Sequence, residues 1–132
     1  MAGSHVTSWP KGIGAVTLFV DDLAAAKHSY LEVFGLAVTL EDNHSAVFDF
    51  GNTIINLLRN AAAQELIEPA AVAPRQAGSR LRFTIEVDDV DAMCAELASR
   101  GVELLNGPLG RPWGVRTASF RDPGGHIWEI AK

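Results

Sequence analysis

The side chains that most often carry metal or acid–base chemistry are sparse in this sequence and poorly spaced for it. His28 falls in a predicted helix, His44 in a predicted turn, and His126 three residues before Glu129. Because successive side chains of a strand alternate between its faces, residues three positions apart face opposite sides. Cys94 is the only cysteine, and no neighbouring residue supplies an activating base. These residues therefore form no evident metal or nucleophile site by themselves.

Composition excludes several classes of partner. With 132 residues and 48% apolar residues, the chain is about one domain long and can build a sizeable core. A formal net charge of −5 opposes binding to nucleic acid or to an anionic membrane surface. The apolar runs are too short to span a bilayer, and no signal segment opens the chain. We expect a soluble, cytoplasmic protein with neither of these partners.

One sequence pattern, a strand followed by a helix, occurs twice along the chain. Residues 13–22 and 80–89 each alternate like a strand and end in a pair of aspartates, and the copies are offset by 89 − 22 = 67 positions. The second aspartate of each pair, Asp22 or Asp89, can cap the helix that follows. Apolar residues at helical spacing then run to a glycine in each copy.

Each copy is expected to finish with three strands, which gives two tandem βαβββ modules of the α+β class. These strands are predicted at residues 38–40, 45–50 and 53–58 in the first copy, and at 103–104, 115–121 and 126–130 in the second. Two four-stranded sheets of this kind can curl and pair into a cup-shaped sheet of eight strands. Concave surfaces favour small-molecule sites.

The predicted boundaries leave a tail and a linker outside the modules. Residues 1–11 are assigned to an N-terminal tail, 12–60 to the first module, 61–79 to the linker and 80–132 to the second module. The linker is rich in alanine and proline and is predicted to hold a helical turn near residues 62–67. It could be a simple connector or a flap over a site.

Several motifs resemble those of a known family. They are the Val-Asp-Asp-Leu that starts at Val20, the helix end Tyr-Leu-Glu-Val-Phe-Gly-Leu from Tyr30, the Val-Asp-Asp-Val-Asp from Val87, the Pro-Trp-Gly from Pro112, and the closing Phe-Arg-Asp-Pro-Gly-Gly-His-Ile-Trp-Glu from Phe120. The chain from about residue 12 onward, apart from the linker, resembles the vicinal oxygen chelate superfamily of glyoxalases, bleomycin-resistance proteins and extradiol dioxygenases. The resemblance implies paired modules around a cavity, often supported by a homodimer.

The resemblance also implies where a metal would bind. Enzymes of the family hold a divalent metal on the first and last strand of each module, and the repeat places these positions at Ala15, Asn56, Arg82 and Glu129. Alanine has no lone pair, arginine stays protonated, and Asn56 offers only a weak neutral oxygen. One good ligand of four remains, so we expect no metal or other cofactor.

The altered positions suggest a different polar centre. If Arg82 and Glu129 share the concave face, they can form an ion pair where relatives hold a metal. The alternatives are an ordinary exposed strand residue at Arg82 and a polar edge residue at Glu129. On the first module, Thr17 and Asn56 are expected to line the cup.

Aromatic residues on the remaining strands could stack against a flat organic ligand. These candidates are Phe48, Phe50, Trp113 and Phe120. Trp113 stands out because Pro112 and Gly114 place it in a loop, although a position on the rim or at a dimer contact fits equally well.

Two function classes follow from these residues. The first is a metal-independent module, similar to bleomycin-resistance proteins, that binds a small organic ligand between its modules. The second is an enzyme of the superfamily, a lyase, isomerase or dioxygenase, with a shifted metal site or with Glu129 as general base and Arg82 stabilising an anion. The missing ligands favour the first class.

Overall fold

The computed structural model describes residues 10–132, and its elements repeat one order twice. The predicted tail, residues 1–11, lies mostly outside this range. The first module contains β1 (Ala15–Val20), α1 (Leu23–Phe34), β2 (Val38–Glu41), β3 (Ser45–Asp49) and β4 (Ile54–Arg59). The second contains β5 (Arg82–Glu86), α3 (Val90–Ser99), β6 (Leu104–Gly110), β7 (Arg116–Arg121) and β8 (Ile127–Ala131).

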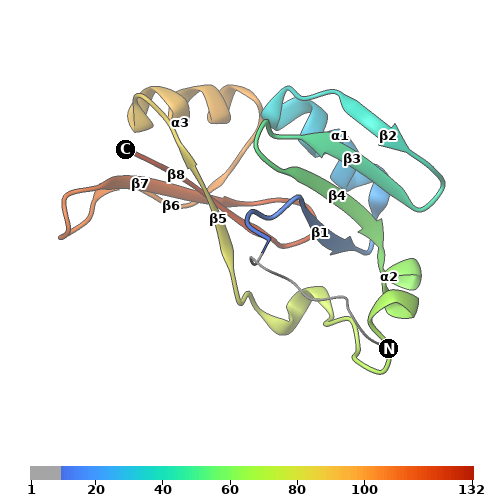
Figure 1. The fold of residues 1–132 in the computed structure, drawn as a ribbon. Coiled ribbons are helices and arrows are strands. Elements are labelled where there is room, and N and C mark those ends of the chain that lie inside the picture. The colour runs from blue at the N-terminus through green and yellow to red at the C-terminus, as the bar shows by residue number, and fades with distance from the viewer. Residues whose placement is uncertain (1–9) are drawn as a thin grey trace.

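The two modules form sheets of identical topology. Each is a four-stranded sheet, of order β1-β4-β3-β2 in the first module and β5-β8-β7-β6 in the second. The first and last strands of each module pair in parallel, and the other neighbours are antiparallel. Figure 1 shows the modules side by side. The predicted α+β fold of two βαβββ modules is confirmed.

The helices begin at the predicted residues. Asp22 Oδ1 accepts a hydrogen bond from the backbone N–H of Ala25 at 3.0 Å, and Asp89 Oδ1 accepts one from Ala92 at the same distance. Each carboxylate thereby satisfies one of the free N–H groups of a first helical turn. At the end of α1, Gly35 adopts φ = 66°, a left-handed conformation that glycine tolerates. The repeated aspartates are therefore matching N-caps.

The linker is more regular than a simple connector. It forms α2 (Asn60–Ile67) and a 3₁₀ turn (Arg75–Ala77). Ala63 of α2 is fully buried, and Leu58 on β4 is also buried. In Figure 1, α2 and the rest of the linker lie across the sheets from α1 and α3. None of the helices in the described range is long and apolar enough to cross a membrane.

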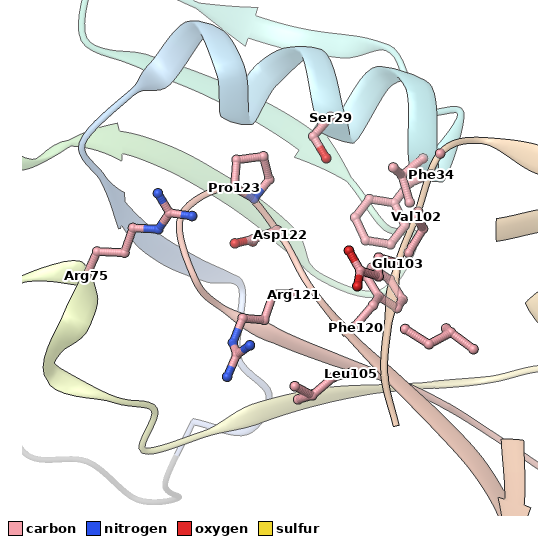
Figure 2. Close-up of a pocket in the computed structure, with 13 residues that line it drawn as sticks. Ser29, Phe34, Arg75, Val102, Glu103, Leu105, Phe120, Arg121, Asp122 and Pro123 are labelled. Carbon is pink, nitrogen blue, oxygen red and sulfur yellow. The ribbon is translucent and has the colours of Figure 1, made fainter. Parts of the chain in front are cut away.

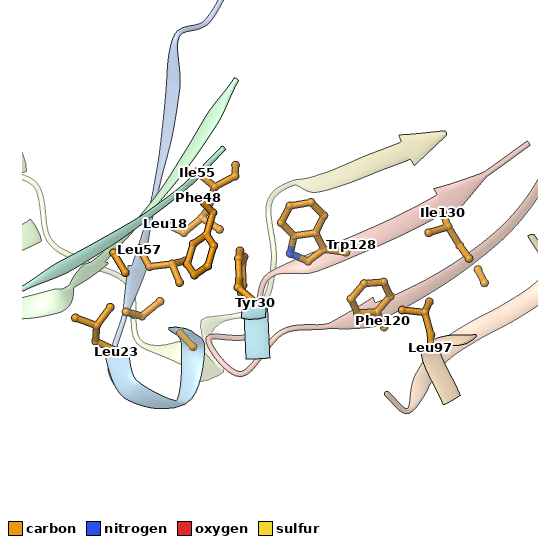
Figure 3. Close-up of a cluster of buried hydrophobic side chains, with 14 of the residues drawn as sticks. Leu18, Leu23, Tyr30, Phe48, Ile55, Leu57, Leu97, Phe120, Trp128 and Ile130 are labelled. Atoms are coloured by element: carbon orange, nitrogen blue, oxygen red, sulfur yellow. The ribbon is translucent and has the colours of Figure 1, made fainter. Parts of the chain in front are cut away.

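One hydrophobic core joins the helix-facing sides of both sheets. Tyr30 on α1 is fully buried, with its ring centroid 5.4 Å from that of Phe48 and 5.9 Å from that of Trp128 on β8. Phe34 lies 4.7 Å from Trp128 by the same measure. Figure 3 shows Tyr30 between the apolar side chains of the first module and Trp128 of the second. Helix α1 therefore packs against both modules.

A buried carboxylate connects this core to the turn between β7 and β8. Asp122 is 5% exposed, and its Oδ2 accepts hydrogen bonds from the Tyr30 hydroxyl at 2.7 Å and from Trp128 Nε1 at 3.4 Å. Its Oδ1 accepts the backbone N–H of His126 at 2.9 Å and lies 3.1 Å from the ring Nδ1 of His126. Both carboxylate oxygens are thus satisfied, as a buried charge requires.

The ionisation of this pair follows from its surroundings. Burial alone would raise the pKa of Asp122, but hydrogen bonds and charge from His126, with the Tyr30 hydroxyl, bring it below its usual value. Burial, followed by the charge of Asp122, raises the pKa of Tyr30 far above its usual value. The tyrosine therefore stays protonated and donates to a carboxylate across the module boundary.

Replacing Tyr30 with phenylalanine should remove this contact without leaving a large cavity. We expect Tyr30→Phe to lower the free energy of unfolding by about 1.5–3 kcal/mol, the usual contribution of a hydrogen bond to a charged group. Urea denaturation followed by circular dichroism measures the change. In an Asp122→Asn background the same substitution should cost less. A Tyr30→Phe variant as stable as the parent would contradict this account of the contact.

Candidate functional site

The polar centre of the second module is an ion pair on the sheet face away from α3. Arg82 Nη1 lies 2.8 Å from Glu129 Oε2, with 52% of the arginine side chain exposed and 5% of the glutamate side chain. The Thr84 hydroxyl donates to Glu129 Oε1 at 3.0 Å. Each oxygen of a nearly buried carboxylate thus has a partner, while much of the guanidinium faces outward.

Strand pairing explains why these three residues meet. Strands β5 and β8 run parallel, with Thr84 opposite Glu129 and Arg82 opposite Ile127. Residues two positions apart share a face, so Arg82 and Thr84 both lie over the β8 position of Glu129. Trp128 and Ile130 alternate with Glu129 and enter the core. The apolar face of β8 thereby fixes the direction of its carboxylate.

A small cavity opens beside the ion pair. Its volume is about 390 Å³, and its lining includes Arg82, Asn106 and Ser119. Ser119 on β7 is opposite Glu129 and is 3% exposed. Sequence reasoning did not single out Asn106 or Ser119. Ser119 alternates with Ala118 and Phe120, which was the available signal, whereas the register shift between Leu104 and Asn106 hides the direction of Asn106.

The predicted residues of the first module lie on β1 and β4. Thr17 is exposed and stands opposite Asn56 in the parallel pairing of these strands. Asn56 Oδ1 is buried and has no hydrogen-bond partner among the described residues. An acceptor in this state costs about 1–3 kcal/mol unless a donor reaches it. Neither Thr17 nor Asn56 makes a hydrogen bond to Arg82 or Glu129, so the structure does not join the two pairs.

The four family metal positions do not supply a usual ligand set. Ala15 has no donor atom, Arg82 is cationic, and the carboxylate of Glu129 is already bound by Arg82 and Thr84. Zinc and related ions need three or more nitrogen, oxygen or sulfur ligands converging on one point. Within residues 10–132, no group of three histidine, cysteine or acidic side chains could hold a metal ion. The residues present do not fit a metal at these positions.

The aromatic predictions need correction for two residues. Phe48 and Phe120 are 0% and 2% exposed and belong to the core under the helices, so they leave no surface for a ligand in the cup. Phe50 is half-buried: it stacks on Trp128 at 5.4 Å between ring centroids and also lines a cavity of about 450 Å³ with Thr84. The physical reason is that Phe48 and Phe120 pair across the sheet with core residues of β4 and β8. Aromatic residues here build the core.

Trp113 is the exception among the aromatic candidates. It is 68% exposed and lies in the turn between β6 and β7, as its flanking proline and glycine indicate. Strand β6 is longer than expected, running to Gly110, and carries this turn beyond the sheet. The structure does not bring Trp113 into contact with the Arg82 and Glu129 pair within the described residues.

Comparison with known proteins places this fold and site in a family. The profile of the Glyoxalase/Bleomycin resistance protein/Dioxygenase superfamily matches residues 12–130. The chain therefore belongs to this superfamily. The resemblance seen in the motifs is confirmed, and the vicinal oxygen chelate fold is shown.

Two curated relatives have similar lengths. The uncharacterized protein YraH of Bacillus subtilis (strain 168) is 32% identical over 121 residues, which are 89% of this chain and 94% of that protein. The metallothiol transferase FosB of Shouchella clausii (strain KSM-K16) is 30% identical over 125 residues, with 90% and 78% covered. Of these two relatives, only FosB is named for a reaction.

Solved structures agree on the architecture. A glyoxalase/bleomycin resistance protein/dioxygenase from Nocardioides has 25% identity and a TM-score of 0.85, covering 96% of this chain and 85% of its own. A lactoylglutathione lyase from Agrobacterium tumefaciens has 24% identity and a TM-score of 0.73, with 92% and 93% covered. The second likeness supports the fold alone.

Replacing Arg82 should show how much the ion pair with Glu129 contributes to the free energy of unfolding. We expect Arg82→Met to lower the free energy of unfolding by about 1–3 kcal/mol, because the buried carboxyl group of Glu129 would be left with Thr84 as its sole partner. Adding Glu129→Gln to Arg82→Met should restore most of the loss, since the buried group is then neutral. Denaturant titrations at pH 7 measure both variants. Equal stability of Arg82→Met and the parent would show that the ion pair contributes nothing.

Proposed function

We propose that this protein binds a small organic ligand without a metal ion, on the concave face centred on Arg82 and Glu129. The observation that carries the proposal is the ion pair itself. Its arginine occupies one family metal position and its glutamate another, at a separation of 2.8 Å. A divalent cation brought to this place would have to displace Arg82 or share Glu129 with it.

Arg82 is well suited to hold a polar group of such a ligand. Glu129 anchors one end of the guanidinium, and about half of the side chain remains accessible. A guanidinium has five N–H donors in a fixed plane, so the anchored group can still donate to a carbonyl or carboxylate. Ser119 and Asn106, which line the same cavity, add polar contacts. Because the ion pair is neutral overall, it suits acceptor-rich ligands as well as anions.

We also propose that a second copy of the chain completes the cup, in the cytoplasm. Thr17 on β1 and Thr84 on β5 are both exposed on this chain, as is Trp113 in the β6–β7 turn. A homodimer would cover these positions and could bring the first-module pair of one copy toward the second-module site of the other. The unpartnered Asn56 Oδ1 would then find a donor on the partner or on the ligand.

An enzymatic role is the alternative, and one comparison favours it. The relative named a metallothiol transferase is 30% identical over 90% of this chain. A shifted metal site or Glu129 as general base would be needed here. Both Glu129 oxygens are already hydrogen-bonded or ion-paired, so the carboxylate would have to release a partner before accepting a proton. This requirement is the reason for preferring the binding role.

Metal titration separates the two functions. We expect no stoichiometric binding when the protein is dialysed with Mn, Fe, Ni or Zn and its metal content is measured by mass spectrometry. Glu129→Ala serves as the matched control, because it removes the one good ligand of the four positions. One equivalent of metal in the parent that disappears in Glu129→Ala would overturn the metal-free proposal.

Ligand binding can be followed by intrinsic fluorescence. We expect a saturable change in tryptophan emission with at least one compound from a panel of aromatic antibiotics and aromatic metabolites. The response should be lost in Arg82→Met and kept in Arg80→Gln, an arginine with no hydrogen bond or ion pair in the described structure. Trp113→Phe tests whether that residue reports the ligand. Absence of any saturable response across the panel would count against the proposal.

A further inference from the structure

A second cavity lies away from the cup, between the two modules. Its volume is about 630 Å³, within the range of small-molecule sites. We call it the intermodule cavity. It is lined by Ser29, Val33 and Phe34 of α1, Arg75 of the linker, residues 101–105 at the start of β6, and residues 120–123 at the end of β7. Figure 2 shows these side chains surrounding the space.

Two arginines of this cavity, Arg75 and Arg121, have no carboxylate partner among the described residues. Arg82, Arg100 and Arg116 each form an ion pair with an acidic side chain. Arg75 and Arg121 make no side-chain hydrogen bond or ion pair with any of residues 10–132. In a chain of formal net charge −5, two unpaired cations on one cavity mark a place for an anion.

The position of Arg75 is set by the turn that follows β7. A Cβ placed on Gly125 would lie 3.3 Å from Cγ of Arg75, so the arginine stem rests on this glycine. Gly125 itself has φ = 90°, a conformation that favours glycine, and its N–H donates to the carbonyl of Asp122 at 3.0 Å. The turn anchored by buried Asp122 thus holds Arg75 at the cavity. Figure 2 shows Arg75 and Arg121 both on the Asp122 side.

The opposite wall is apolar, with one acidic group. Phe34 is half-buried and presents part of its ring, next to Val33 and Val102. Glu103 is exposed on the same side in Figure 2 and has no ion-pair partner among the described residues. Asp122 lines the cavity as well, but its two oxygens are already occupied by Tyr30, Trp128 and His126. The guanidinium groups of Arg75 and Arg121 therefore lie across the intermodule cavity from the ring of Phe34.

We propose that the intermodule cavity is a second binding site, which takes a small aromatic carboxylate. The carboxylate lies between Arg75 and Arg121, where each guanidinium can donate charge-assisted hydrogen bonds. The ring lies against Phe34 and the neighbouring valines, where aromatic contact adds to apolar burial. Glu103 opposes a second negative charge on the ligand. The site is independent of the Arg82 and Glu129 pair and does not rest on the function proposed for it.

Phenylacetate is a suitable probe, with 2-phenylethanol as the uncharged analogue of the same size. In ¹H–¹⁵N NMR titrations of the full chain, phenylacetate should give saturable shifts at the amides of Ser29, Glu103 and Asp122. Arg75→Gln and Arg121→Gln should each weaken its binding roughly tenfold, the effect of losing one charge-assisted hydrogen bond. 2-Phenylethanol should bind weakly to the parent and equally to both variants.

Two further variants make the test specific. Arg80→Gln removes the same charge five residues further along the chain without touching the cavity and should leave the affinity for phenylacetate unchanged. Glu103→Gln should strengthen it by removing a repulsive charge. Matching spectra of the free variants confirm that they are folded. No saturable shift at the cavity amides would overturn the proposal, as would equal weakening in Arg80→Gln. Shifts confined to Thr84 and Ser119 would overturn it too, while supporting the site at Arg82.

Discussion

A carboxylate buried at a module boundary must have all its hydrogen bonds made, and this requirement at Asp122 organises much of the molecule. Its four donors come from Tyr30 on α1, from Trp128 on β8, and from the backbone and ring of His126 in the intervening turn. Satisfying them fixes the distance of α1 from the second sheet. Because Trp128 then points into the core, the next residue, Glu129, must face the other way, toward Arg82. The same turn carries Gly125, on which Arg75 rests.

The sequence predicts those parts of the fold that depend on local chemistry or on the repeat. Both N-caps, at Asp22 and Asp89, could be named in advance because capping uses a donor three residues away. The Arg82 and Glu129 pair could be proposed because the family resemblance supplied a register between β5 and β8. In these cases the place of a residue in the repeat or in the motif was enough to predict its contact.

Features that depend on contacts between distant segments were missed or misread. The sequence around Asp122 indicates only the break between two predicted strands, since nothing near it reveals the Tyr30 hydroxyl 92 residues away. Phe120 lies between polar neighbours and Phe48 between Val47 and Asp49, so the pattern does not say which face the helices cover. The helices decide this, and they cover the aromatic face. The intermodule cavity was also unpredictable, because its two arginines come from the linker and from β7.

The two faces of the sheets carry different kinds of side chain. Polar side chains that need satisfaction, such as Glu129 and Ser119, lie on the sheet face away from the helices, while aromatic residues fill the other face. The paired arginine at one face and the unpaired arginines at the intermodule cavity then offer different electrostatic environments. The arginine of the first is bound to Glu129, whereas Arg75 and Arg121 at the cavity have no side-chain partner among the described residues, so the two places suit different ligands.

The positions that form the hydrogen bond between Tyr30 and Asp122 have equivalents in the other half of the repeat, and the two sets differ in chemistry. Phe50 and Asp122 occupy equivalent places, since each donates its backbone N–H to the residue just before the last strand of its module. The equivalent of Tyr30 on α3, at the 67-residue offset, is Leu97. The hydrogen bond between Tyr30 and Asp122 therefore has no counterpart at Leu97 and Phe50, whose side chains are both apolar. Two modules encoded as identical chains could not differ in this way, because one substitution would alter both equivalent positions at once. Because both copies lie in one chain, each of these positions can be substituted without changing its counterpart in the other module.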